Sequence, residues 1–182
     1  MMDEKVLEEK KLSREDKYHG ILMDIHVDTV LLPNGKTAVR EVADHVDGVA
    51  VLALDERNNV LTVTQYRYVF GKTLLELPAG KLDPGEDPVT GALRELKEET
   101  GAVPGQLLPM GVYLGSPGCL GEELHLFLAR DLQMADAQPD ADEFLEMARV
   151  PFDEMVHRIM SGEITDGKTI AAVLKAKLLL DL

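Results

Sequence analysis

The chain contains 182 residues, of which 45% are apolar and 29% are charged. This composition indicates a globular protein of about one domain, and it excludes intrinsically disordered, collagen-like and membrane-spanning classes. Nineteen Lys and Arg residues against 33 Asp and Glu residues give a formal net charge of −14, which repels nucleic-acid phosphates and anionic lipids. We therefore expect no nucleic-acid partner and no membrane partner.

The first residues and the cysteine content predict a cytoplasmic location. The N-terminal segment alternates charges and lacks the apolar core of a signal peptide, and no run approaches the roughly 20 apolar residues of a membrane span. The single cysteine, Cys119, cannot form an internal disulfide, which fits a reducing compartment.

The N-terminal part of the chain predicts a small β-hairpin that follows a polar arm. Residues 1–17 are almost all polar and are expected to form a mobile or weakly helical arm. Apolar side chains then alternate at period two over residues 20–32, and Pro33-Asn34-Gly35-Lys36 supplies a turn before a second strand. We expect a hairpin subdomain over residues 18–46, which would serve dimerisation, and a larger domain over residues 47–182.

The larger domain is predicted to combine strands with flanking helices. Strand-like runs occur at 48–54, 60–65, 73–77, 107–114, 124–129 and 144–150, and helical patterns at about 88–100, 152–161 and 167–180. Strands outnumber helices and do not alternate with them regularly. This order predicts an α+β fold rather than a regular βαβ series.

The helix expected over residues 88–100 has well-defined ends and two separate faces. Asp87 can cap its start, Pro88 suits its first position, and Gly101 can end it in the left-handed conformation. At 100° per residue its apolar side chains form one narrow stripe, and its glutamates form a separate arc. We therefore expect one face in the core and one acidic face.

The acidic arc contains Glu95, Glu98 and Glu99. Glu95 and Glu99 are four residues apart, so their like charges destabilise the helix by about 0.2–0.5 kcal/mol unless a cation intervenes. Hard oxygen ligands favour Mg²⁺ or Mn²⁺, and Mg²⁺ usually binds a few carboxylates together with substrate phosphates. Taken alone, three carboxylates on one arc more often form a solvated helix face than a metal site.

A longer pattern surrounds these carboxylates. Gly80, Glu86 and the run Arg94-Glu-Leu-Lys-Glu-Glu-Thr-Gly-Ala102 occupy every fixed position of the Nudix box, Gly-x5-Glu-x7-Arg-Glu-U-x-Glu-Glu-x-Gly-U. The sequence therefore resembles the Nudix hydrolases, which cleave nucleoside diphosphates linked to another group by means of divalent metal. The resemblance implies a Nudix-type mixed β-sheet sandwiched by helices.

The resemblance also implies roles for individual residues. Glu95 and Glu99 would be the main ligands of Mg²⁺, with Mn²⁺ as an alternative ion, and the carbonyl of Ala79 and the side chain of Glu98 would be further ligands. Arg94 and Glu86 would brace the loop and the helix. The structural positions of the box are Gly80, Glu86, Arg94 and Gly101.

A second resemblance concerns the substrate. The ADP-ribose pyrophosphatase branch of the family carries a proline sixteen residues beyond the last glycine of the box, and Pro117 lies sixteen residues beyond Gly101. The similarity covers about residues 20–180. It implies binding of the substrate's phosphates or ribose by Arg40 and Arg67, although each could instead form a surface salt bridge. The implied substrate-binding positions are Tyr18, Arg40, Glu41, Arg67, Lys81, Pro117 and Gly118.

The interpretation of the whole sequence is hydrolysis of ADP-ribose to AMP and ribose 5-phosphate by a homodimer. In this branch a hairpin such as residues 21–42 reaches the partner's active site. The Nudix box leaves the base unspecified, so another nucleoside diphosphate sugar, for example GDP-mannose, is an alternative substrate. A non-catalytic nucleotide sensor is the alternative from another class, but such a protein would be expected to lose box carboxylates.

The general base is expected in the acidic loop at residues 136–143. Glu143 is the first choice, because it opens a segment that matches the branch, and Asp142 and Asp140 come next. A solvated loop that only adds charge is the alternative. If none of the three residues acts as the base, Glu98 or Glu122 becomes the candidate.

Overall fold

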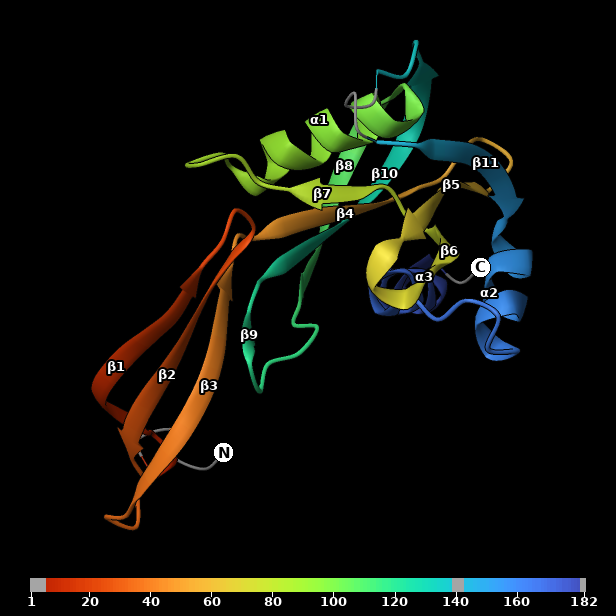
Figure 1. The fold of residues 1–182 in the computed structure, drawn as a ribbon. Helices are drawn as coiled ribbons and strands as arrows, with labels where there is room; N and C mark the ends of the chain where they lie inside the picture. Colours follow the sequence, from red (N-terminus) through yellow and green to blue (C-terminus); the bar gives the residue numbers. More distant parts are fainter. Residues whose placement is uncertain (1–5, 139–142, 181–182) are drawn as a thin grey trace. The chain divides into compact units, whose positions relative to one another are not determined.

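The computed structural model describes residues 6–138 and 143–180, and the chain divides into two compact units. Unit 1 comprises Met1–Val46 and Ser116–Glu122, and unit 2 comprises Asp47–Gly115 and Glu123–Leu182. Figure 1 shows the elements of both units in the colours of the sequence. No helix in the described ranges is long and apolar enough to cross a membrane.

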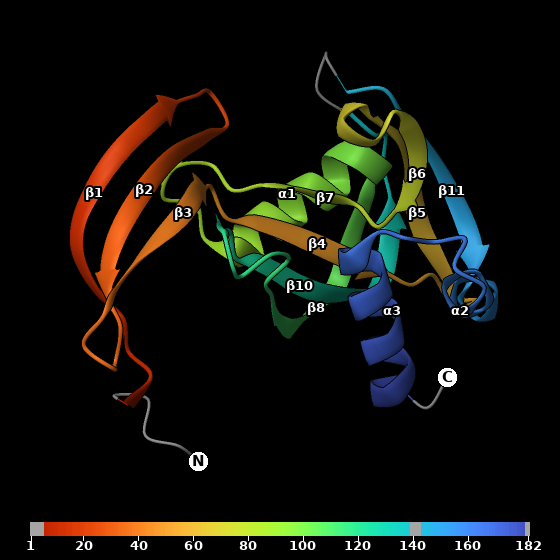
Figure 2. The same ribbon diagram turned by 60° about the horizontal axis from the view of Figure 1, so that its bottom comes forward.

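Unit 1 is built on a sheet of order β1-β2-β3-β9. The antiparallel strands β1 (Lys10–His19), β2 (Met23–Leu31) and β3 (Thr37–His45) form most of it, and β9 (Leu120–Gly121) adds to β3 in parallel. Figure 2 shows the first three strands as a curved sheet. Residues 10–17 were expected in a polar arm but belong to β1. This strand lies at the edge of the sheet with all its side chains exposed, so its polar composition is compatible with a strand.

The predicted turn at residues 33–36 joins β2 to β3. Gly35 has a φ of +82°, which is favourable for glycine because it has no Cβ, and the Lys36 N–H donates to the Asn34 side chain at 3.0 Å. The turn therefore forms for the reason that its sequence suggests.

Unit 2 contains two sheets, of order β7-β4-β10-β8 and β11-β5-β6. β10 runs parallel to β4 and antiparallel to β8, so the first sheet is mixed. The strands are β4 (Gly48–Ala53), β5 (Asn59–Arg67), β6 (Lys72–Glu76), β7 (Ala79–Lys81), β8 (Ala102–Tyr113), β10 (Leu124–Met134) and β11 (Leu145–Pro151), and the helices are α1 (Pro88–Thr100), α2 (Phe152–Met160) and α3 (Gly167–Leu180).

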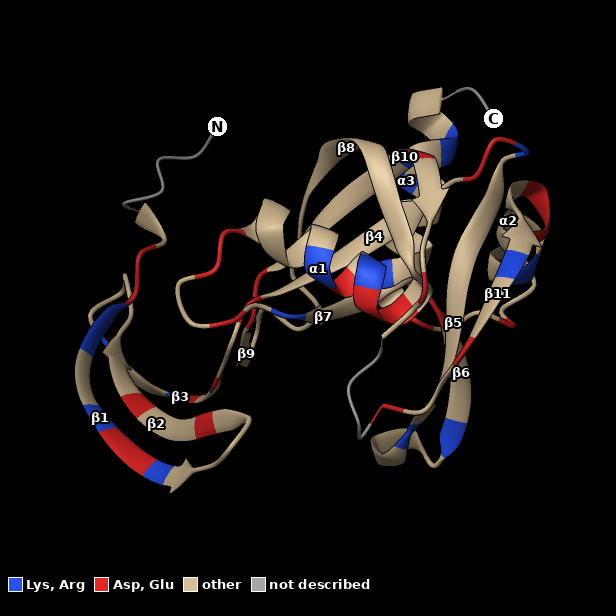
Figure 3. Ribbon diagram, turned by 90° about the horizontal axis from the view of Figure 1, so that it is seen from above, with Lys and Arg blue, Asp and Glu red and all other residues tan. Residues whose placement is uncertain are grey.

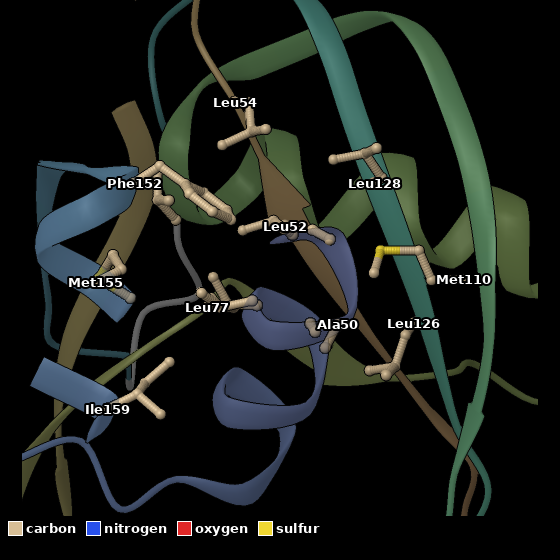
Figure 4. Packing of buried hydrophobic residues seen from close by; sticks show 14 of the residues in the cluster. Ala50, Leu52, Leu54, Leu77, Met110, Leu126, Leu128, Phe152, Met155 and Ile159 are labelled. Carbon is tan, nitrogen blue, oxygen red and sulfur yellow. The ribbon is translucent and has the colours of Figure 1, made fainter. Parts of the chain in front are cut away.

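Both faces of β4 are buried. Ala50 and Leu52 pack into one apolar cluster with residues of α2 and α3, whereas Val49 and Val51 pack into another cluster with residues of α1. Figure 1 shows α1 and α3 on opposite sides of β4, and Figure 4 shows the first cluster at close range. The predicted mixed sheet between helices, and with it the α+β fold class, is confirmed.

The differences from the predicted elements concern strand ends and very short strands. β8 begins at Ala102, five residues before the predicted start, because its pairing with β10 continues through Pro104 and past the left-handed Asp131. β7 and β9 are three and two residues long, too short to produce a hydrophobic period. All three predicted helices occur within one residue of their expected ends.

Candidate active site

The helix α1 is held at both ends by the predicted caps. The Asp87 carboxylate accepts hydrogen bonds from the backbone N–H groups of Val89 and Thr90, and Gly101 ends the helix with a φ of +73°. Ala92 and Leu96 are fully buried against β4, which fixes the rotation of the helix. Figure 3 shows the charged residues gathered along α1 beside β7.

Glu95 lies directly against the backbone of β7. A Cβ atom at Gly80 would lie 2.1 Å from the carboxyl carbon of Glu95, so glycine is required for this approach. Glu95 is 7% exposed, and burial raises its pKa, although Arg94 acts in the opposite direction. The charges of Glu98 and Glu143 raise the pKa further.

Glu99 is buried next to Glu95 and is fixed by the chain entering β7. Its Oε2 atom accepts a hydrogen bond from the Ala79 N–H at 3.0 Å. Burial, together with the charges of Glu95 and Glu143, raises the pKa of Glu99 to about 8, and the Ala79 N–H and the charge of Lys168 oppose this shift. The structure thus brings Glu143, the first choice for the base, within electrostatic range of two predicted metal ligands.

Arg94 connects the predicted box residues to one another. Its Nε and Nη2 atoms donate to both oxygens of Glu86, at 3.0 and 2.8 Å, and Nη2 also donates to the carbonyl of Lys81 at 2.9 Å. Its Nη1 atom donates to Glu95 at 2.8 Å and to Glu98 at 3.0 Å. These contacts tie the loop to the helix, and the guanidinium lowers the pKa of Glu86 to about 2.

The donor set suits a hard divalent cation. Glu95, Glu98 and Glu99 supply carboxylate oxygens from one helix. Glu95 and Glu99 are buried, and the charge of Glu95 adds to the effect of burial in raising the pKa of Glu99. Within the described ranges, however, no three acidic, His or Cys side chains converge as a metal site. The physical reason is that Glu95 and Glu98 point to Arg94 while Glu99 points to the Ala79 N–H.

Two predicted substrate-binding residues of unit 2 make contacts with the protein itself. Arg67 forms a two-pronged pair with Glu76, with Nε–Oε1 and Nη2–Oε2 distances of 2.7 and 2.6 Å. Glu76 is 1% exposed, so it requires such a partner. Lys81 has an exposed side chain at the end of β7, and its carbonyl accepts from Arg94.

The remaining predicted substrate-binding residues belong to unit 1. Arg40 on β3 pairs with Glu9 through both prongs of its guanidinium, with an Nε–Oε2 distance of 2.9 Å. Tyr18 on β1 is exposed over more than half of its surface. The other members of this group are Glu41 on β3 and Pro117 and Gly118 in the segment that precedes β9.

Among the other candidates for the base, Asp140 and Asp142 lie outside the described residues. Glu122 belongs to unit 1, where its carboxylate lies 3.3 Å from Nδ1 of His45. Glu143 is the candidate whose charge acts on Glu95 and Glu99.

A largely buried polar cluster at the start of α3 was not predicted from the sequence. Glu76 also hydrogen-bonds Lys168, which lies 3.0 Å from Asp166, and the Asp166 carboxylate accepts from the Thr169 N–H and hydroxyl. An acidic residue within the apolar run Leu-Leu-Glu-Leu-Pro was the available signal, because a charge flanked by buried positions needs a buried partner.

Comparison with known proteins agrees with this geometry. The NUDIX domain profile matches residues 44–173. The chain is 39% identical to an ADP-ribose pyrophosphatase of Bacillus subtilis (strain 168), over 93% of this chain and 92% of the relative. It is 40% identical to a methanol dehydrogenase activator of Bacillus methanolicus, with the same coverage.

A solved structure shows the same fold. The crystal structure of an ADP compounds hydrolase superposes with a TM-score of 0.83, at 21% sequence identity, and covers 96% of this chain and 95% of that one. The profile match, the identity to relatives over most of the chain and the fold agree with the box geometry on α1 and β7. The chain is a Nudix hydrolase.

Proposed function

We propose that this hydrolase cleaves the pyrophosphate bond of ADP-ribose and releases AMP and ribose 5-phosphate. The observation that carries the proposal is the burial of Glu95 and Glu99 together against the backbone of β7, with Glu143 acting on both. The position of Pro117 and the likeness to an ADP-ribose pyrophosphatase support the choice of substrate.

The proposed cofactor is Mg²⁺, with Mn²⁺ as a substitute. Glu95, Glu99, the carbonyl of Ala79 and, less directly, Glu98 would hold it. When bound, the ion would polarise the pyrophosphate and lower the pKa of bound water. Its positive charge would also offset the burial and the charge repulsion that together raise the pKa of Glu99.

The protein's own groups would bind the substrate and accept a proton. Glu143 would act as general base toward the attacking water, with Asp142 and Asp140 as alternatives. Arg67 would offer a phosphate oxygen its Nη1 group, since the pair with Glu76 occupies Nε and Nη2. The further substrate contacts would come from Lys81 and from the unit 1 residues Tyr18, Arg40, Glu41, Pro117 and Gly118.

We also propose that the enzyme is a cytoplasmic homodimer. The antiparallel strands of unit 1 would reach the active site of the partner, and the exposed Cys119 fits a reducing compartment. Light scattering at micromolar concentration tests the dimer. A fully active monomer would rule it out.

A substrate panel at fixed Mg²⁺ tests the proposed reaction. The values of kcat/KM for ADP-ribose, GDP-mannose, ADP-glucose, NADH and diadenosine polyphosphates are compared, and the products are separated by chromatography. We expect ADP-ribose to be preferred at least tenfold, equivalent to about 1.4 kcal/mol, with AMP as a product. A preference for GDP-mannose would overturn the substrate assignment, and binding of nucleotides without turnover would indicate a sensor.

The variant Glu99→Gln is the matched control for the panel. It keeps the size of the side chain and removes one metal-binding charge, so kcat should fall by orders of magnitude. Near-normal activity of this variant at saturating Mg²⁺, with unchanged circular dichroism, would refute the proposed metal ligands.

A further inference from the structure

The start of α3 is hydrogen-bonded to the chain that leads into β7. The backbone N–H of Leu77 donates to Thr169 Oγ1 at 2.9 Å, across 92 residues of sequence, and both residues are fully buried. The Thr169 hydroxyl donates in turn to Asp166, which also caps α3 by accepting the Thr169 N–H at 3.1 Å. The backbone at residue 77 is therefore attached to the capped end of a helix.

The neighbouring side chain is attached to the same helix end. Lys168 hydrogen-bonds the carboxylate of Glu76 and lies 3.0 Å from Asp166. Glu76 is buried and takes its other two hydrogen bonds from Arg67. A buried carboxylate that loses such a partner keeps the cost of desolvation without compensation, so Lys168 restrains the position of Glu76.

The next two residues are fixed by other elements. The carbonyl of Pro78 accepts from the Val51 N–H of β4 at 2.9 Å, and the Ala79 N–H donates to Glu99 of α1 at 3.0 Å. Leu77 and Ala79 are separated by two Cα–Cα steps of about 3.8 Å each, and a segment this short cannot absorb a displacement at one end. A shift at Leu77 would therefore reach Ala79 and the contact with Glu99.

We propose that Thr169 and Lys168 are positioning residues for the metal-binding edge of the site. They hold Leu77 and Glu76, and through them they place the Ala79 backbone against Glu99. The alternative is that both residues only stabilise the start of α3. The inference rests on the proposed metal site, and it assigns a part in that site to a helix that lies outside the Nudix box.

A titration with Mn²⁺ and no substrate tests the inference, with the free ion measured by its electron paramagnetic resonance signal. The variant Thr169→Val keeps the shape of the side chain but removes the acceptor for the Leu77 N–H, and we expect its Mn²⁺ dissociation constant to rise at least tenfold. Thr169→Ser retains the hydroxyl and should stay within threefold of the wild type. Equal affinity of Thr169→Val and the wild type would overturn the proposal.

A second pair of variants separates positioning from helix stability. Lys168→Met should also weaken Mn²⁺ binding at least tenfold. This variant keeps the Thr169–Leu77 hydrogen bond, so it tests the proposal even if Thr169→Val does not fold. Lys175→Met is the control, because Lys175 lies on the same helix but hydrogen-bonds the carbonyl of Met110 on β8 rather than residues 76–79. If Lys175→Met weakens Mn²⁺ binding as much as Lys168→Met does, the effect belongs to helix stability and the proposal is wrong.

Kinetics add a readout that a purely structural role would not produce. In Thr169→Val the Mg²⁺ concentration for half-maximal activity should rise at least tenfold, while KM for ADP-ribose at saturating Mg²⁺ stays within threefold. Absence of ADP-ribose turnover in the wild type would count against the proposed function alone, because the Mn²⁺ titration contains no substrate. If the wild type does not bind Mn²⁺, both the proposed metal site and this inference are wrong.

Discussion

Gly80 of β7 approaches Glu95 of α1 so closely that a methyl group on Gly80 would lie 2.1 Å from two atoms of the carboxyl group. The backbone of Gly80 is not in the left-handed region, so the close approach of Glu95, rather than the backbone conformation, is the reason for glycine at this position. The strand and the helix are in contact at the point where the metal is proposed to bind.

Gly80→Ala should therefore separate Ala79 and Glu95 while most of the core remains intact. We expect kcat to fall at least a hundredfold and the affinity for Mn²⁺ to weaken. Gly115→Ala is the matched control, because a Cβ there would meet its nearest neighbour at an ordinary 3.5 Å. Equal activities of the two variants would contradict the close packing.

The metal-free enzyme should lose stability as the pH rises. The pKa of Glu99 is raised from 4.5 to about 8, so between these values the folded protein holds a proton that the unfolded chain has released. The free energy of unfolding should consequently decrease from about pH 5 to about pH 8 and then level off. Urea unfolding in the presence of a chelator measures this dependence.

Glu99→Gln should remove this part of the pH dependence, because an amide does not ionise. Above pH 8 the metal-free variant should be at least as stable as the wild type, although it is inactive. The same slope in the variant and the wild type would show that another group titrates in this range.

Glu143→Gln should lower kcat at least a hundredfold and leave KM within a few-fold. A positioned base contributes roughly 10²–10⁴-fold, whereas a solvated charge contributes little. Asp142→Asn and Asp140→Asn are tested in parallel. If all three variants keep more than a tenth of the wild-type kcat, the base lies elsewhere, and Glu98 or Glu122 would be examined next.

Arg94→Lys should destabilise the loop between β7 and α1 even though the charge is kept. A lysine has one ammonium group and cannot reach both oxygens of Glu86 while it also contacts Glu95 and Glu98. We expect faster hydrogen exchange at residues 82–86 and a loss of activity. Unchanged exchange in this loop would show that the guanidinium fork is dispensable.

The sequence was informative where the determinants are local. Asp87, Pro88 and Gly101 act on their own helix, and both ends of α1 fall where these residues predict. The contact between Glu76 and Lys168 joins residues 92 positions apart, so the sequence could indicate that Glu76 needs a buried partner but not which residue supplies it. Arg67 and Glu76 are only nine positions apart, and a salt bridge was the alternative given for Arg67, but the sequence did not identify the buried Glu76 as its partner.

The double-sided burial of β4 also affects how the chain reaches its fold. The segment Val49–Leu54 contains neither proline nor a charge, and its parallel partner, β10, begins only at Leu124. During synthesis this apolar segment remains unpaired with β10 until that strand has been made, and apolar segments of this kind aggregate readily when exposed. Asp47 and Asp55 flank it with negative charge, in the positions where charged residues oppose intermolecular pairing of unprotected strands.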